Sequence, residues 1–221
     1  MRTKGGRTPG LVIFDCDGVL VDTEPVANRL LVTILAEAGL TMSYAECRTR
    51  FVGRMLEEIQ HDIETTLERP LGVDWCADVR ARTEGAFAAG IEPIHGIRQQ
   101  IERLKAEGRT FCVASSGKIS KMHVTLGQTG LLPLLSPVLF SAEMVGKGKP
   151  APDLFLHAAR EMGYSPQQSI VIEDSLYGVQ AGVAAGMKVL GYAADPQSDA
   201  AALAEAGATV FHSMDQLPEL L

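Results

Sequence analysis

The sequence predicts an α/β protein in which a doubly wound parallel sheet carries a helical cap inserted after the first strand. Three observations predict this fold. A short, continuous apolar run at residues 11–15 is typical of a buried parallel strand. From residue 24 to about residue 90, apolar residues recur at the three- and four-residue spacing of helices. After Gly96, helical and strand-like segments alternate, which favours a parallel sheet covered by helices on both faces.

The cap stretch divides into segments at its glycines and polar breaks. Gly39 stops the first helical pattern, and Ser43 has the chemistry of an N-cap for the second. No strand pattern occurs between residues 24 and 90, so we expect a cap of four helices. The expected helices span residues 24–39, 43–51, 55–67 and 73–90.

The remainder of the chain should complete the core, because each helical pattern in it is followed by a strand pattern. The expected helices are 97–108, 119–130, 152–163, 176–186 and 198–207, and the expected strands are 110–115, 137–141, 169–174, 188–192 and 209–211. We therefore predict a flexible leader at 1–10, a core formed by 11–22 and 92–221, and a cap domain at 23–91.

Composition and charge argue against some classes of binding partner and some cellular locations for this chain. The net charge of −7 disfavours nonspecific binding to nucleic acid or acidic membranes. The most apolar later stretch, residues 131–140, is interrupted by Pro133 and Pro137 and is too short to cross a bilayer. The basic, glycine-rich residues 1–10 lack the apolar centre of a secretory signal. The four cysteines show no C-x-x-C pair, so we expect buried free thiols and a cytoplasmic protein.

Polar residues follow the predicted strands, where ligand sites of open α/β sheets form. They are Asp15 and Asp17, Ser115 and Ser116, the lysine-containing loop 146–153, and Glu173 and Asp174. The carboxyl ends of parallel strands meet at one edge, so these groups should converge there. Several carboxylates with a hydroxyl and a lysine suit Mg²⁺ with a phosphate beside it.

Four stretches carry a family resemblance: "DCDGVLVDTE", "VASSG", "GKGKPAPD" and "VIEDSLYGVQAG". In this order, and with a helical insert after the first strand, they resemble the haloacid dehalogenase (HAD) superfamily. The likeness covers residues 11–221 and is to members with a helical C1 cap, similar to β-phosphoglucomutase-like phosphatases. It implies a Rossmann-like core and Mg²⁺-dependent phosphoryl transfer.

The resemblance implies roles for the first motif. Asp15 matches the nucleophile, which forms an aspartyl-phosphate and so divides hydrolysis into two steps. Asp17 matches the acid/base that protonates the leaving oxygen and later activates water; a plain turn aspartate is the alternative. Gly18 suits a backbone that must turn and approach a phosphate closely.

The remaining motifs complete the expected site. Ser115 is expected to grip a phosphate oxygen, although it could also cap the next helix, and Ser116 is expected to offer its backbone N–H. Lys149 matches the lysine that neutralises charge between nucleophile and phosphoryl group, with Lys147 as the alternative. The expected Mg²⁺ ligands are the Asp15 carboxylate, the Asp17 carbonyl, Asp174, and Glu173 directly or through water.

The cap is expected to supply substrate contacts. Arg54 is the candidate for binding the leaving group's oxygens or a second phosphate, whereas Arg48 and Arg50 fit ordinary helix-surface charges. Apolar cap residues are expected to pack in the cap rather than bind a cofactor; they are Phe51, Met55, Trp75 and Phe87.

The reaction expected from the resemblance is hydrolysis of a small phosphorylated metabolite, a sugar phosphate or sugar-acid phosphate. Family dehalogenases lack an aspartate at the position of Asp17, and phosphonate hydrolases use a cap lysine, whereas residues 24–90 contain no lysine. A sugar phosphomutase of the β-phosphoglucomutase type is the first alternative, with Arg80 or Arg82 as a second cap cation. A catalytically silent phosphate-binding or regulatory protein is the other. We expect a monomer, because the cap already shields the site.

Overall fold

The computed structural model describes residues 10–51, 54–196 and 198–221. The chain forms two compact units, of which the smaller is Asp22–Glu92 and the larger combines the chain before Asp22 with Pro93–Leu221. The smaller unit differs by one residue at each end from the predicted cap, 23–91, whose standing as a separate domain stays a prediction. The predicted leader, 1–10, lies outside the described residues except for Gly10.

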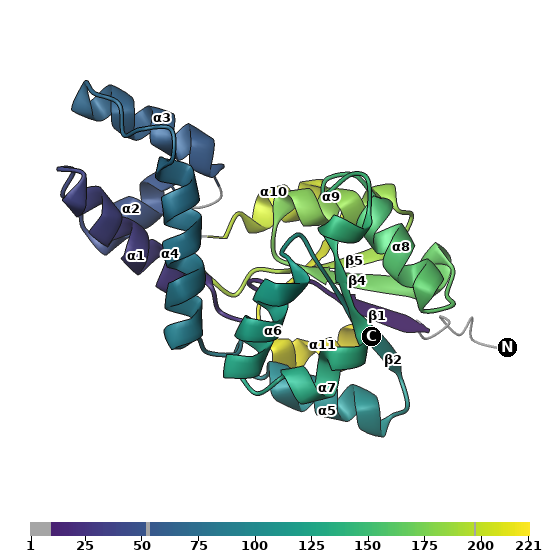
Figure 1. Cartoon of the computed structure of the whole chain (residues 1–221). Helices are drawn as coiled ribbons and strands as arrows, with labels where there is room; N and C mark the ends of the chain where they lie inside the picture. Colours follow the sequence, from purple (N-terminus) through teal and green to yellow (C-terminus); the bar gives the residue numbers. More distant parts are fainter. Residues whose placement is uncertain (1–9, 52–53, 197) are drawn as a thin grey trace, which may run out of the picture. The chain divides into compact units, whose positions relative to one another are not determined.

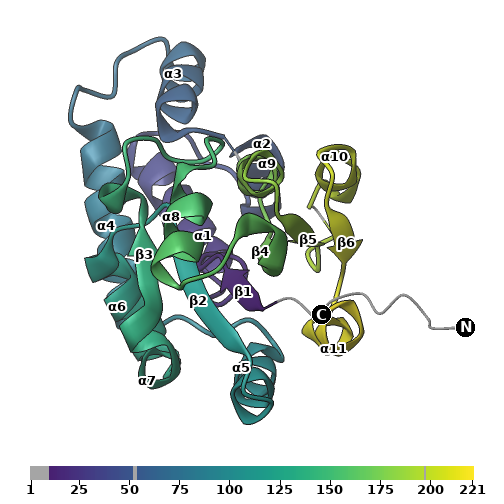
Figure 2. The same ribbon diagram turned by 90° about the vertical axis from the view of Figure 1, so that its right-hand side faces the viewer.

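The larger unit contains a six-stranded parallel sheet in its described part (Figures 1 and 2). Its strands are β1 (Leu11–Phe14), β2 (Thr110–Ser115), β3 (Leu139–Ser141), β4 (Ser169–Glu173), β5 (Lys188–Tyr192) and β6 (Thr209–Phe211). Their spatial order is β3-β2-β1-β4-β5-β6, which is that of a doubly wound fold. The predicted fold class is confirmed.

Helices cover both faces of this sheet (Figures 1 and 2). One face carries α8 (Asp153–Glu161), α9 (Leu176–Ala184) and α10 (Ala200–Glu205). The other carries α5 (Ile97–Ala106), α6 (Ile119–Gln128), α7 (Leu132–Leu135) and α11 (Leu217–Leu220). The chain changes face between β3 and β4, so the strand order reverses beside β1, where α/β folds of this kind bind ligands.

The register of the central strands determines which residues meet at the carboxyl edge. Phe14, the last residue of β1, pairs with Val113 on β2 and with Ile172 on β4. The next residue on each strand therefore stands level with its neighbours: Asp15, Ala114 and Glu173. A hydrogen bond from the Asp15 N–H to the Ile172 carbonyl, 2.9 Å long, continues the ladder to this level.

The sheet is fixed by complete burial of its central strand. All residues of β1 are inaccessible to solvent, and Phe155 of α8 and Val179 of α9 pack in the cluster on one face. Full burial of a side chain such as Phe155 stabilises the folded state by about 1.5–3 kcal/mol relative to leaving it exposed. The four cysteines are buried free thiols, as expected. No helix in the described part of the chain has both the length and the apolar character of a membrane span.

The smaller unit contains the helices α1 (Glu24–Glu37), α2 (Tyr44–Phe51), α3 (Leu56–Leu67) and α4 (Trp75–Ala89). Phe51 and Trp75 are buried in its core, as predicted, but Met55 is 58% exposed, so the packing role predicted for Met55 is wrong. Ser43 caps α2, because its Oγ accepts a hydrogen bond from the Glu46 N–H at 3.2 Å.

Some local predictions fail where proline intervenes. Residues Ser136–Val138 form a 3₁₀ turn, so β3 begins at Leu139 and not at Pro137. The short helix α7 begins with a Leu-Pro pair and was not predicted, and neither was α11. Proline is tolerated in a first helical turn, where its missing N–H has no intrahelical partner to lose.

Candidate functional site

Lys149 lies at the centre of the carboxyl edge of the sheet. Its Nζ donates hydrogen bonds to Asp15 Oδ1 at 2.5 Å and to Glu173 Oε1 at 2.7 Å. A third bond, 3.2 Å long, reaches the main-chain carbonyl of Ala114. These partners are the three residues that the register sets level on β1, β4 and β2, so one ammonium group joins neighbouring strands at the reversal of strand order.

Burial controls the charges of this group. The side chains of Lys149 and Asp15 are 5% and 9% exposed. Burial raises the pKa of Asp15 to about 7, with Lys149 acting against the rise and Glu173 and Asp17 adding to it. Burial alone would lower the pKa of Lys149, but Asp15 and Glu173 outweigh it and raise that pKa. Lys149 is therefore charged at neutral pH, and a further cation near Asp15 would favour its ionised form.

Asp17 is paired with a different cation. The Nζ of Lys121 on α6 lies 2.9 Å from Oδ1 and 2.8 Å from Oδ2 of Asp17. The loop that carries Asp17 is closed by a hydrogen bond from the Gly18 N–H to the Val21 carbonyl, 2.9 Å long. The two aspartates that follow β1 thus face separate lysines.

Gly18 brings Asp174 into the same site. Its φ of +77° lies in the left-handed region, and a methyl group on its Cα would collide with the Asp174 carboxylate. That carboxylate therefore packs directly on the loop that carries Asp15 and Asp17. The structure brings together the end of β1 and the end of β4, as the sequence predicted.

The donor set suits an open Mg²⁺ site. Asp15 and Asp174 offer carboxylates and Asp17 offers its main-chain carbonyl, all hard oxygen donors. Within the described ranges, no group of three or more His, Cys, Asp or Glu side chains is arranged to hold a metal by itself. Mg²⁺ commonly uses one or two carboxylates, retains several waters and binds substrate phosphate. These residues fit that mode, and their assignment as ligands stays a prediction.

Glu173 is held by protein groups at both carboxylate oxygens. While Oε1 accepts from Lys149, Oε2 accepts from the N–H and the hydroxyl of Ser175, at 2.8 and 2.9 Å. Glu173 is only 1% exposed, and a methyl group on Gly178 would collide with its carboxylate. These contacts favour a role in orienting Lys149, and direct or water-mediated metal binding by Glu173 stays a prediction.

Ser115 ends β2 at the same edge and is 1% exposed. Its Oγ accepts a hydrogen bond from the Gly117 N–H at 3.0 Å. The alternative that Ser115 caps the next helix is wrong, because α6 begins at Ile119 and Lys118 occupies the cap position. Ser116 is exposed and follows the last residue of β2 that pairs with β3, Ser115.

The choice between the two lysines of the 146–153 loop is decided by contact. Lys149 touches Asp15, whereas Lys147 is exposed. The role of Lys149 in phosphoryl transfer stays a prediction, but its geometry supports that role.

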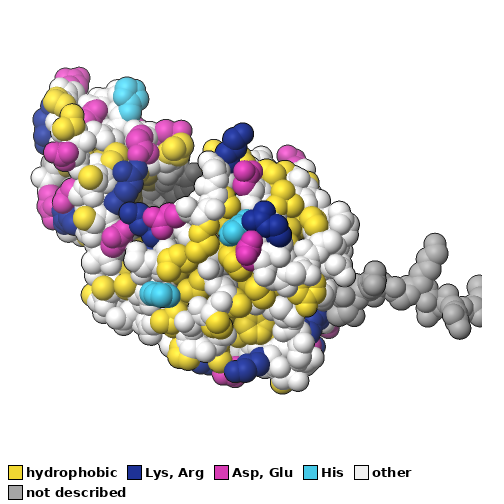
Figure 3. Space-filling view, turned by 45° about the vertical axis from the view of Figure 1, so that its right-hand side comes forward, with side chains coloured by type: hydrophobic (Ala, Val, Ile, Leu, Met, Phe, Trp, Pro, Cys, Tyr) yellow, Lys and Arg dark blue, Asp and Glu magenta, His cyan; other side chains and the backbone are white. Residues whose placement is uncertain are grey.

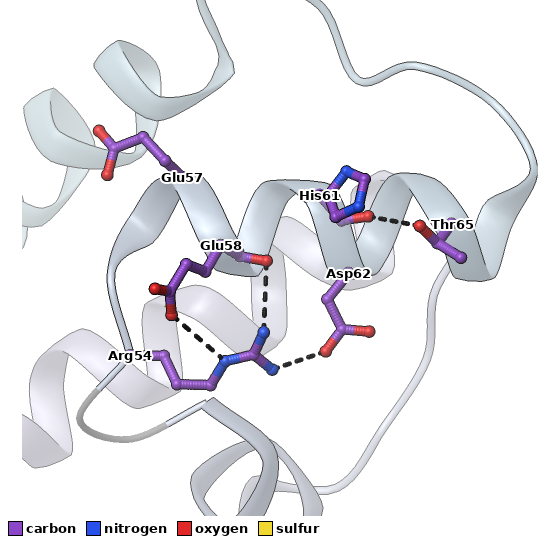
Figure 4. Close-up of a pocket in the computed structure, with 6 residues that line it drawn as sticks. All are labelled: Arg54, Glu57, Glu58, His61, Asp62 and Thr65. Atoms are coloured by element: carbon purple, nitrogen blue, oxygen red, sulfur yellow. Dashed lines mark hydrogen bonds and ion pairs between the residues drawn. The ribbon is translucent and has the colours of Figure 1, made fainter.

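Arg54 belongs to the smaller unit and is engaged there. Its Nη1 donates to Asp62 Oδ2 at 2.7 Å, its Nη2 donates to the Glu58 carbonyl at 3.4 Å, and its Nε lies 3.9 Å from Glu58 Oε2 (Figure 4). The surrounding hollow has a volume of about 590 Å³ and is lined by Arg54, Glu57, Glu58, His61, Asp62 and Thr65. Arg54 thus meets two carboxylates, those of Glu58 and Asp62, so substrate binding by Arg54 would require it to share these contacts and stays a prediction.

Two further arginines of the smaller unit also meet carboxylates. Arg80 pairs with Glu57, and Arg82 binds Glu37 through contacts of 2.6 and 2.9 Å. Figure 3 shows acidic and basic side chains interspersed over the smaller unit. These pairs connect α4 to α3 and to α1 within the smaller unit, which is a structural use of the positive charge.

Sequence reasoning missed Lys121, Ser175 and Gly178. Lys121 occupies the first turn of α6, immediately after the Ser115–Gly117 turn, and its position at the carboxyl edge was a usable signal. Ser175 is the N-cap of α9, accepting from the Gly178 N–H at 3.1 Å, in the S-x-x-G order that the sequence displays.

Comparisons with known proteins agree with this geometry. A family model described as haloacid dehalogenase-like hydrolase matches residues 9–186. The 6-phosphogluconate phosphatase of Escherichia coli is 34% identical over 210 residues, covering 95% of this chain and 93% of that protein.

Two solved structures are similar over nearly the whole chain. One is a HAD family hydrolase from Deinococcus radiodurans with bound phosphate and sodium, which is 31% identical and has a TM-score of 0.84. The match covers 96% of this chain and 94% of that protein. The other is a candidate β-phosphoglucomutase from Thermotoga maritima, which is 26% identical and has a TM-score of 0.80. The match covers 96% of this chain and 99% of that protein.

Proposed function

The chain belongs to the haloacid dehalogenase-like hydrolases, and we propose that it is a Mg²⁺-dependent phosphatase of small phosphorylated metabolites. The observation that carries the proposal is the contact of Lys149 with both Asp15 and Glu173 at the carboxyl ends of β1 and β4. A buried lysine beside a buried carboxylate is the arrangement that nucleophilic attack on a phosphate dianion requires, because it offsets the repulsion between two anions.

Asp15 is proposed as the nucleophile. Its second oxygen, Oδ2, receives no hydrogen bond from the described residues, whereas Oδ1 is held by Lys149. Attack of Asp15 on phosphorus forms the aspartyl-phosphate while the bond to the leaving oxygen breaks, and Asp17 supplies the proton to that oxygen. Water then attacks phosphorus, Asp17 takes its proton, and Asp15 and inorganic phosphate are released.

The phosphate group is proposed to lie between Lys149 and the turn after β2. Ser115 and the backbone N–H of Ser116 would bind its non-reacting oxygens. Mg²⁺, held by Asp15, the Asp17 carbonyl and Asp174, would neutralise charge on these carboxylates and on the phosphoryl oxygens. Gly18 leaves the space that Asp174 occupies.

A sugar-acid phosphate or sugar phosphate is the proposed substrate class. Support comes from the likeness to a 6-phosphogluconate phosphatase over almost the full length of both chains. The phosphomutase alternative draws on the likeness to a candidate β-phosphoglucomutase. Its second cap cation would have to be Arg80 or Arg82, and both are paired with glutamates within the smaller unit. The phosphatase is therefore preferred.

Phosphate release from a panel of phosphoesters, with and without Mg²⁺, tests the proposal. The panel includes 6-phosphogluconate, hexose phosphates and p-nitrophenyl phosphate, and β-glucose 1-phosphate is also assayed for conversion to the 6-phosphate. We expect Mg²⁺-dependent hydrolysis, a loss of at least about 10³-fold in Asp15→Asn, and a loss of about 10²–10⁴-fold in Asp17→Asn.

Two results would reverse these assignments. A folded wild-type protein that hydrolyses no member of the panel contradicts the phosphatase. Conversion of β-glucose 1-phosphate faster than any hydrolysis makes the mutase the better description.

A further inference from the structure

Lys121 is a charged residue near the carboxyl edge of the sheet to which no role has been given. It lies in the first turn of α6, and its Nζ meets both carboxylate oxygens of Asp17, at 2.9 and 2.8 Å. The two side chains are 24% and 32% exposed, so the pair is partly shielded from water. Contact with both oxygens fixes the rotation of the carboxylate about its terminal bond, which a single hydrogen bond would leave free.

A rigid turn supports this pair. Gly117 donates its N–H to Ser115 Oγ at 3.0 Å, and its carbonyl accepts from the buried Ser141 hydroxyl at 2.8 Å. A Cβ on Gly117 would stand 3.3 Å from Ser115 Oγ, 3.4 Å from Lys121 Cδ and 3.8 Å from Asp17 Oδ2. The residue proposed to bind phosphate, the acid/base candidate and Lys121 therefore surround one glycine.

The contact matches one half of the proposed cycle. In the proposed cycle Asp17 receives a proton when water attacks the aspartyl-phosphate, and the contact of Lys121 with both carboxylate oxygens holds that carboxylate in one orientation for the transfer. Water forms its bond to phosphorus, its proton passes to an Asp17 oxygen, and the phosphorus–oxygen bond to Asp15 breaks. A freely turning Asp17 would hold that water in many orientations, most of them unproductive.

We propose that Lys121 is a positioning residue that holds Asp17 as the general base for hydrolysis of the aspartyl-phosphate. This inference rests on the proposed function, since it needs the phosphorylated Asp15. It predicts different effects on the two steps of the reaction. Loss of Lys121 should slow dephosphorylation of Asp15 and leave its phosphorylation largely intact when the leaving group needs no proton.

Stopped-flow kinetics with p-nitrophenyl phosphate tests this separation, because p-nitrophenolate leaves without protonation. In Lys121→Met we expect kcat to fall about 10- to 100-fold and kcat/KM to stay within about threefold of wild type. A burst of p-nitrophenolate close to one equivalent per protein should appear, because the phosphorylated protein accumulates. Lys121→Arg should retain most of kcat, since a guanidinium also binds both oxygens of a carboxylate.

Lys105→Met is the matched control and should behave as wild type. Lys105 is an exposed lysine near the end of α5, which leads to the amino end of β2 at the opposite edge of the sheet. If Lys121→Met does not fold by circular dichroism, Lys121→Gln takes its place with the same expected split.

The outcomes are distinguishable. An active wild type with unchanged kcat in Lys121→Met, or with kcat and kcat/KM falling together and no burst, overturns this inference and leaves the phosphatase standing. A wild type that hydrolyses no phosphoester removes the proposed function, and this inference with it.

Discussion

Asp15 and Asp17 stand one residue apart, and the structure gives each its own lysine. Lys149 holds Asp15 from the β3–α8 connection, and Lys121 holds Asp17 from α6. Two carboxylates so close would repel if both were charged without compensation. With the cations distributed in this way, Asp15 Oδ2 accepts no hydrogen bond from the described residues, which fits the proposed attack on phosphorus, and Asp17 is directed toward α6.

Replacement of Gly18 should both strain the backbone and disturb the proposed metal site, and a control variant can separate the two effects. Gly18→Ala forces a side chain into the left-handed region, at a cost of roughly 1–2 kcal/mol, and pushes the Asp174 carboxylate aside. We expect Mg²⁺ affinity, measured by isothermal titration calorimetry, to fall at least about tenfold.

Gly108→Ala is the control for this variant. Gly108 has a φ of +67° and open space around its Cα, so its alanine variant carries similar strain without the collision. Urea unfolding should show comparable destabilisation in the two variants, with Mg²⁺ affinity reduced only in Gly18→Ala. Equal Mg²⁺ affinity in both would show that Asp174 does not bind the metal.

At the scale of elements, Asp62 on α3 connects two arginines of the smaller unit. Arg50 binds it at 2.6 Å and Arg54 at 2.7 Å. Hydrogen bonds from Arg50, and then from Arg54, lower the pKa of Asp62 to about 2. These contacts tie the end of α2 and the segment after it to α3.

Asp62→Asn should therefore destabilise the protein in a pH-dependent way. A lowered folded-state pKa contributes stability above the unfolded value of 3.8, and this stability is lost as pH falls toward 2. Asp62 is partly exposed, so we expect a difference of only about 1 kcal/mol at pH 7. Thermal denaturation of wild type and Asp62→Asn should converge as the pH falls from about 4 to 2.

Asp78→Asn supplies the comparison on α4. Asp78 is 59% exposed and lies 3.7 Å from Arg82, so its removal should change the melting temperature little at any pH. A loss for Asp62→Asn no larger than that for Asp78→Asn would show that the Arg50–Asp62–Arg54 contacts do not stabilise the unit.

The elements were largely predictable because their patterns are local. The apolar run of β1, the helical periodicity of α1 and the strand–helix alternation each follow from nearby residues. The start of β3 was not, because Pro137 lies in a 3₁₀ turn that the apolar pattern does not distinguish from a strand. The Lys121–Asp17 contact joins residues 104 positions apart and depends on strand order, which local patterns do not contain.

In the candidate site, too, some features were predictable from the sequence and others depend on how the chain packs. Strand ends predicted that Asp15 and Glu173 would meet, since parallel strands align their carboxyl ends. They did not predict that Lys149 and Ser175 would engage both oxygens of Glu173, because the first contact depends on the path of the β3–α8 connection and the second on the start of α9 beside the end of β4.

At the scale of the whole molecule, metal binding should be coupled to folding. A ligand bound only by the folded protein stabilises it by about 2.7 kcal/mol at one hundred times its dissociation constant. Saturating Mg²⁺ should therefore raise the melting temperature of wild type measured by scanning calorimetry, and Asp174→Asn should lose most of that rise. An equal rise in both proteins would place the Mg²⁺ elsewhere.

In the proposed mechanism, hydrolysis depends on Asp15 becoming phosphorylated. The direct measurement is rapid acid quenching of wild type mixed with Mg²⁺ and radiolabelled 6-phosphogluconate, or the best substrate of the panel, followed by mass spectrometry of the labelled peptides. We predict phosphate bound to the peptide that contains Asp15, and none in Asp15→Asn. Rapid turnover of that substrate with no label on Asp15, or undiminished turnover by Asp15→Asn, would contradict the account.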